Sequence, residues 1–310
     1  MSFGSKVRQL GHVMSDRRWW HFYLQRQFMG RTYRDRLGDW VASKFRPQCS
    51  HSASLGHESR LRISEMKDAG ITHFGQLLSA DQATELRSYF MKKPVKDTYR
   101  PDSSPFLPDS SERHPDSHVA HHAAQDILLA PYLLSIANRP DILATVQGLL
   151  GCKPTLGYIA TWWSYHTDKG AQQAEHFHRD VDDWRFVKLF IYLSDVGANN
   201  GPHIYVRHSS ASPALRQIRR FTDEEVMATF GSDRVMKLVG RAGEGFLEDT
   251  FGIHKGQPVA EGTRLVFQAV YSMYPLPYGP KAPIMAAKSV VLDDGSYPDP
   301  WINRLYIKNE

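Results

Sequence analysis

HFHRDVDDWRFVKLFIYLSDV, residues 176–196, places two candidate metal ligands directly before a β-strand. From Arg185 onward the stretch alternates bulky apolar residues with others, which predicts a strand. His178 and Asp180 stand two residues apart, so in an extended chain their side chains project to the same side. The stretch therefore predicts two neighbouring ligands of one ion beside a strand.

After Gly151 the sequence changes to short strands on both sides of this stretch. The segments rich in β-branched and aromatic residues are KPTLGYIATWWSYH at 153–166, PHIYVRHSS at 202–210 and TRLVFQAVYSMY at 263–274. GANNG at 197–201 is a turn signal between two of them. A helical N-terminal part followed by many short strands, with no βαβ rhythm, predicts an all-β sandwich or barrel with helices on one side.

The residues before Gly151 carry helix and loop signals. Ser79 is a candidate N-cap for a helix over 81–93, which Pro94 ends. Residues 97–118 hold four prolines among Ser and Asp, which predicts a long irregular loop that contacts substrate or closes over it. Two more helices are expected around 124–138 and 141–150.

The composition is that of an ordinary globular protein. The 310 residues are 41% hydrophobic and 23% charged, enough for one large domain or two small ones. No apolar run approaches the roughly 18 residues of a membrane span, and the first residues lack the features of a secretory leader. Cys49 and Cys152 are too few for a disulfide framework, so a cytoplasmic location is expected.

The positive charge lies near the N-terminus. Residues 1–60 contain 11 Lys or Arg against 4 Asp or Glu, although the whole chain carries only +5. Residues 16–46 predict one or two helices with aromatic and aliphatic side chains at four-residue spacing. These are Trp20, Leu24 and Phe28, then Tyr33, Leu37 and Val41. A cap packed on the main domain is favoured; contact with an anionic membrane or an acidic partner is the alternative.

Residues 47–60 are small and polar and predict a linker. We therefore expect a basic N-terminal helical extension over 1–60 and a main domain over 61–310.

A third metal ligand is expected after the strand region, from His203, His208 or His254. His254 is favoured because Arg264 follows it and opens an apolar strand. Two imidazoles and one carboxylate on one face of Fe(II) leave the opposite face open for chemistry.

Arg264 needs a negatively charged partner, because an unpaired buried charge is costly. The partner is either a carboxylate co-substrate or a structural salt bridge to Glu248 or Asp249.

Over roughly residues 62–290, the chain resembles the phytanoyl-CoA dioxygenase family of Fe(II)/2-oxoglutarate oxygenases. The matching segments are ISEMKDAGITHFGQLLSADQATEL, the WWS at 162–164, residues 176–196, NGPHIYV, FLEDTFGIHKGQP and the strand that holds Arg264. The resemblance implies a double-stranded β-helix (jelly-roll) core. It further implies iron bound by His178, Asp180 and His254, with Arg264 pairing with the distal carboxylate of 2-oxoglutarate and O2 as the oxidant.

The resemblance also implies a reaction and two further contacts. A carboxylate at Asp180 favours hydroxylation over halogenation, whereas desaturation or cyclisation stays open. Trp184 and Lys188 are candidates for contact with the co-substrate; a core tryptophan and a lysine that reaches solvent are their alternatives.

The expected partner is a small organic or lipid-like substrate, not nucleic acid, and the oligomeric state is left open. A non-catalytic jelly-roll binding protein is the competing function.

Overall fold

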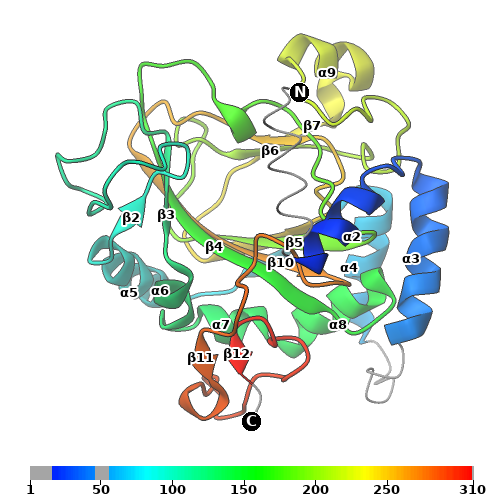
Figure 1. Ribbon diagram of the computed structural model, residues 1–310. Helices are drawn as coiled ribbons and strands as arrows, with labels where there is room; N and C mark the ends of the chain where they lie inside the picture. Colours follow the sequence, from blue (N-terminus) through cyan, green and yellow to red (C-terminus); the bar gives the residue numbers. More distant parts are fainter. Residues whose placement is uncertain (1–15, 46–55, 309–310) are drawn as a thin grey trace.

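The computed structural model describes residues 16–45 and 56–308, and its centre is a pair of antiparallel sheets (Figure 1). The larger sheet has seven strands in the order β1-β8-β5-β10-β4-β3-β2. Their bounds are β1 Ile71–Gln76, β8 Glu244–Glu248, β5 Phe186–Tyr192, β10 Thr263–Ser272, β4 Thr155–Tyr165, β3 Val119–His122 and β2 Val95–Lys96. The smaller sheet, in the order β7-β6-β9, contains β7 Val235–Leu238, β6 His203–Val206 and β9 His254–Gly256.

The strand order is that of a jelly roll. From β4 onward the chain passes back and forth between the sheets, and strands pair from the outside inward: β4 with β10, the segment at His178 with β9, and β5 with β8. The innermost pair is β6 with β7. A long hairpin folded over on itself produces this nested pairing. The expected double-stranded β-helix is therefore confirmed.

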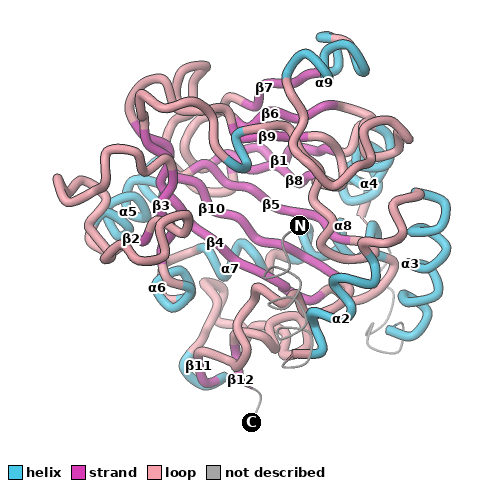
Figure 2. The backbone as a smooth tube through the Cα atoms, turned by 45° about the horizontal axis from the view of Figure 1, so that its top comes forward, coloured by secondary structure: helices cyan, strands magenta, loops and turns pink. Residues whose placement is uncertain are grey.

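The two faces of the larger sheet have different neighbours. Leu189 of β5 and Phe267 of β10 belong to the main apolar core, together with helix residues such as Leu86 and Ile142. Phe190, which points the other way, packs in a second apolar cluster with residues of the smaller sheet. All seven residues of β5 are buried. Helices cover one face, and the interior of the roll lies on the other (Figure 2).

The helices follow local signals for the most part. Their bounds are α2 Arg17–Gln25, α3 Arg31–Phe45, α4 His57–Asp68, α5 Ala80–Met91, α6 Ala124–Leu128, α7 Leu133–Ala137, α8 Pro140–Leu150 and α9 Asp223–Phe230. Ser79 caps α5 as expected: its hydroxyl accepts a hydrogen bond from the Gln82 amide at 3.1 Å, and the Gln82 side chain accepts one from the Ser79 amide at 2.9 Å. The short strands β11 Met285–Ala286 and β12 Ile307–Lys308 pair in parallel near the C-terminus.

Two expected boundaries are wrong. The helix expected over 124–138 is divided, because the chain turns at residues 129–132 between α6 and α7. The expected linker over 47–60 overlaps α4, which begins at His57 although its first residues are polar. Residues 46–55 lie outside the described part of the chain.

The N-terminal helices α2 and α3 lie against the main domain at one edge of the molecule (Figure 1). Trp20 and Leu24, the members of the predicted stripe that lie on α2, are 62% and 45% exposed, whereas Phe22 and Gln25 are buried. Phe28 follows the helix and is 40% exposed, with its ring against Trp184. The N-terminal helices therefore pack on the main domain, as favoured, but α2 uses the face that carries Phe22 and Gln25. Among the residues described, no helix is both long and apolar enough to cross a membrane.

Candidate metal centre

His178 and His254 are held by a backbone bridge between the extended segment at His178 and strand β9. The His178 amide donates to the His254 carbonyl at 2.9 Å, and the His254 amide donates back at 3.0 Å. This pairing places the two imidazole rings 4.3 Å apart, centre to centre. The separation of the two rings is therefore fixed by strand pairing, although the residues are far apart in the sequence.

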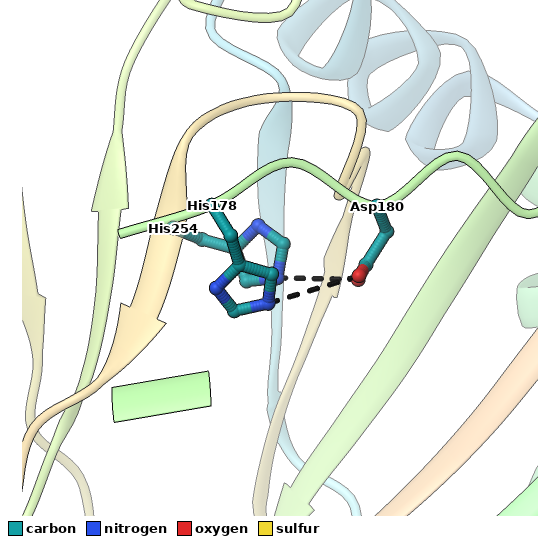
Figure 3. Close-up of side chains that lie close together, drawn as sticks. All are labelled: His178, Asp180 and His254. Carbon is teal, nitrogen blue, oxygen red and sulfur yellow. Dashed lines mark ion pairs between the residues drawn. The ribbon is translucent and has the colours of Figure 1, made fainter. Parts of the chain in front are cut away.

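Asp180 completes the group from the same extended segment as His178. Its amide donates to the Thr250 carbonyl at 2.9 Å, and its carboxylate lies 3.7 Å from His178 Nε2 and 3.2 Å from His254 Nε2. The three side chains point toward one another (Figure 3). Their candidate ligand atoms all lie within 4.8 Å of each other, which is close enough to share one cation.

Hydrogen bonds orient both imidazoles for metal binding. His178 Nδ1 lies 2.8 Å from the His176 carbonyl, and His254 Nδ1 lies 3.0 Å from the Gly252 carbonyl. A carbonyl only accepts, so each Nδ1 carries a proton, and each Nε2 is the atom turned toward Asp180. Burial holds the pKa of His178 well below its usual value, which keeps that ring neutral. Both rings turn their Nε2 atoms toward Asp180, where a shared ion would lie.

Lys188 of β5 supports Asp180 from inside the roll. Its ammonium lies 2.7 Å from Asp180 Oδ2 and 3.0 Å from Asp182 Oδ2, and the side chain is buried. Burial opposes both charges, but each stabilises the other. The pKa of Lys188 is consequently raised, and that of Asp180 is held well below its usual value. The expectation that Lys188 reaches solvent is wrong, because two carboxylates from the ligand segment meet it.

Arg264 lies buried on β10 without a carboxylate partner among the described residues. Its guanidinium donates to the Gly201 carbonyl and, at 3.0 Å, to the Ser164 hydroxyl. The alternative salt bridges are absent from the described structure, since Asp249 pairs with Arg31 at 3.1 Å and Glu248 faces His203. Burial lowers the pKa of Arg264. An uncompensated buried cation is the feature that a carboxylate ligand would satisfy.

The other histidine candidates do not join the ligand group. The His203 ring stacks on His254 at 5.5 Å, and its Nε2 lies 2.8 Å from Glu248 Oε2. Burial raises the pKa of Glu248 to about 8 and lowers that of His203 to about 3, so a neutral pair lies beside the ligands. His208 instead contacts the Asp68 carbonyl at 2.9 Å, outside the site.

Trp184 lies under the N-terminal helices. Its ring is 5.7 Å from that of Phe28 and 5.7 Å from the Arg34 guanidinium. These contacts support the packing alternative; a role for Trp184 at a co-substrate stays a prediction.

Sequence reasoning did not find Asp182. The two-residue spacing from Asp180 was a usable signal, because both carboxylates project to the side that Lys188 occupies.

Polar anchors from the N-terminal helices hold the chain directly after Asp180. The Gln25 side-chain amide donates to the Val181 carbonyl at 2.7 Å, and Arg34 donates to the Asp183 carbonyl. His21 Nε2 lies 2.8 Å from the Asp183 carboxylate. The ligand segment is therefore fixed on one side by Lys188 and on the other by α2 and α3.

No model of a protein family matches this sequence, and no curated protein matches it. Among solved structures, EctD from S. alaskensis with 2-oxoglutarate and 5-hydroxyectoine is 17% identical over 72% of this chain and 78% of its own, with a TM-score of 0.49. HygX from Streptomyces hygroscopicus with nickel, 2-oxoglutarate and hygromycin B is 14% identical over 77% and 96%, with a TM-score of 0.47.

A third structure, the non-heme alpha ketoglutarate dependent epimerase SnoN from nogalamycin biosynthesis, is 15% identical over 69% of this chain and 82% of its own, with a TM-score of 0.48. All three TM-scores lie below 0.5. The fold of this chain is established by its own strand order.

Proposed function

We propose that this protein is a non-haem Fe(II)- and 2-oxoglutarate-dependent oxygenase that hydroxylates an unactivated C–H bond of a small organic or lipid-like substrate. The observation that carries the proposal is the convergence of two oriented imidazoles and one carboxylate, with the unpaired Arg264 buried in the same roll. Two nitrogens and one oxygen, without a thiolate, suit Fe(II) and leave positions open for co-substrate and O2.

Each side chain then has a defined task. His178, Asp180 and His254 would hold the iron, and Arg264 would pair with the distal carboxylate of 2-oxoglutarate. Iron with 2-oxoglutarate and O2 supplies the oxidising power for the C–H bond. Lys188 keeps Asp180 ionised and oriented, and its two carboxylate partners favour this role over direct contact with the co-substrate. The chain thus contributes binding, orientation and a water-poor interior.

The finer parts of the proposal rest on the sequence. Membership of the phytanoyl-CoA dioxygenase family rests on the matching segments, and a cytoplasmic location rests on the two cysteines. The division into an extension over 1–60 and an oxygenase domain over 61–310 stays a prediction. The buried anchors of α2 and α3 favour an extension that works with the domain.

Anaerobic titration with Fe(II) and 2-oxoglutarate tests the ligand assignment. The wild type should develop a weak visible absorption from metal-to-ligand charge transfer. Asp180→Ala and His254→Ala should abolish it, because each removes one protein ligand. His176→Ala is the matched control, since this exposed imidazole belongs to the same segment and contributes only its backbone to the site. Absorption that survives in either ligand variant would refute the assignment.

Arg264→Ala tests the co-substrate site separately. A lost charge-assisted pair should weaken 2-oxoglutarate binding by roughly 10- to 150-fold. Arg241→Ala, at an exposed position, should leave the affinity unchanged. Equal affinities in the two variants would show that Arg264 is structural. Succinate release and a product that gains one oxygen atom, measured across a substrate panel, would separate hydroxylation from desaturation or cyclisation.

A further inference from the structure

A cavity of about 250 Å³ opens beside Asp180 and is unusually rich in arginine. Its lining residues come from three parts of the chain: the end of α2, the ligand segment and the loop before α9. They are Arg26, Arg179, Asp180, Val181, Asp182, Ile218, Arg219 and Arg220. Because Asp180 is a candidate metal ligand, a molecule in this cavity would lie next to the metal.

The uncompensated charge of the cavity is positive. Arg26 and Arg220 form no ion pair with a carboxylate in the described part of the chain, and Arg26 instead lies over the Phe22 ring at 4.6 Å. Arg219 is paired with Glu225 at 2.6 Å. The negative charges on Asp180 and Asp182 are already shared with Lys188. Two guanidinium groups are therefore free to meet an anion.

Arg179 fixes the loop that carries Arg220. It is buried, and its guanidinium donates only to backbone carbonyls: those of Leu215 at 2.9 Å, Ser209 at 2.8 Å, Ala214 at 2.9 Å, and Phe251. Since all these partners are carbonyls, Arg179 acts as a structural tie between the loop and the residue next to His178.

A second tie holds the end of the same loop. The amide of Phe221, the residue after Arg220, donates to the Phe177 carbonyl at 2.8 Å. Arg220 is consequently set beside the strand that carries His178, although its side chain is exposed. The fold thus holds the backbone of Arg220 at the edge of the cavity.

We infer that this cavity binds an anionic group of the substrate, a phosphate, sulfate or carboxylate, through Arg26 and Arg220. The inference deepens the proposed function and rests on it. Guanidinium groups bind such oxyanions through paired, charge-assisted hydrogen bonds, and a positive mouth also steers anions inward. The co-substrate has its own cation in Arg264, which is buried on β10 against Gly201 and Ser164.

The test uses the full-length protein loaded anaerobically with Fe(II) and 2-oxoglutarate, so that the metal and Arg264 are occupied. Inorganic sulfate and acetate are titrated calorimetrically at constant ionic strength; the first represents a tetrahedral ester, the second a carboxylate. The variants are Arg26→Gln with Arg220→Gln together, and Arg220→Lys. The matched control is Arg36→Gln, an exposed arginine on α3 that does not line the cavity.

The double variant should bind the preferred anion roughly tenfold more weakly than the wild type, as expected for lost charge-assisted hydrogen bonds. Arg220→Lys should lose less anion affinity, and the control should lose none. All variants should keep the visible absorption with Fe(II) and 2-oxoglutarate. The inference is overturned if neither anion binds, if the double variant binds as tightly as the wild type, or if it loses 2-oxoglutarate instead.

Failure of the proposed function has a different signature. The wild type would then form no visible absorption with Fe(II) and 2-oxoglutarate. Sulfate and acetate titrations of the metal-free protein, with the same variants, would still decide whether Arg26 and Arg220 bind an anion.

Discussion

The seven-stranded sheet is held by apolar burial, whereas the N-terminal helices reach the ligand segment mainly through polar contacts, although Val41 and Ala42 of α3 also join the main apolar core. In the sheet, β5 and β10 contribute apolar side chains that are buried on both faces, such as Phe267 on one face and Phe190 on the other. At the N-terminus, the main links to the ligand segment are polar: Gln25 and Arg34 donate to backbone carbonyls, while Trp20 faces outward. Apolar burial is non-directional, whereas hydrogen bonds fix the positions of particular atoms.

This difference separates stability from positioning. The sheet contributes fully buried apolar side chains to the core, and their burial stabilises the fold. The helices bind Val181 and Asp183, immediately after Asp180, and so help to fix the path of the segment that carries this carboxylate. Substitutions in the sheet core should mainly lower the free energy of unfolding. Substitutions at the polar anchors should lower the metal affinity as well.

The largest expected effect is on the core. Phe267→Ala removes a side chain that is 1% exposed and should lower the free energy of unfolding by about 3–5 kcal/mol, because it leaves a cavity. Urea unfolding measures this loss. The fraction that remains folded should bind metal as the wild type does, since Phe267 lies on the face away from the roll interior. A large loss of metal affinity in folded Phe267→Ala would show that the sheet core also positions the metal ligands.

An intermediate effect is expected at the N-terminal anchor. Arg34→Met removes the guanidinium that donates to the carbonyls of Phe28 and Asp183 and to the side-chain oxygen of Gln25, and should cost about 1–3 kcal/mol of stability. It should also weaken metal binding, because the segment after Asp180 loses support. Arg36→Met on the exposed side of α3 is the control and should change neither quantity. Unaltered metal affinity in the Arg34 variant would mean that the helices only cover the domain.

The smallest effect is expected on the outer face of α2. Trp20→Ser should change the free energy of unfolding by no more than about 0.5 kcal/mol, because the side chain is 62% exposed. Thermal or urea unfolding is sufficient to measure it. A loss well above this limit would show that Trp20 contributes to packing after all.

The sequence predicts the parts of this molecule that follow short-range rules. β4, β5 and β10 are rich in apolar, aromatic and β-branched residues. Ser79 and Gln82 form a capping box that depends only on their local spacing. His178 and Asp180 are predictable as neighbours because alternate residues of an extended chain share a side.

The remaining features depend on contacts between distant segments. Gln25 and Arg34 are polar yet buried, so a search for apolar periodicity selects the exposed stripe of α2 instead. For Lys188, the two-residue period of a strand predicts which face of β5 carries the side chain, but not which group its ammonium contacts. Whether a lysine reaches water or a carboxylate depends on the path of Asp180 and Asp182, which come from the turn before β5. Arg26 joins the mouth of the cavity only because α2 docks beside the ligand segment.

The reciprocal backbone bonds between His178 and His254 have a consequence for how such a protein diversifies. The spacing of the rings is set by this bridge, whereas residues 216–220 lie between the two ties of the loop, at Leu215 and at Phe221. Insertions or substitutions there can change the side chains that line the cavity, such as Arg220, while the two imidazoles keep their separation. Substrate selectivity can therefore change in this fold without loss of metal binding.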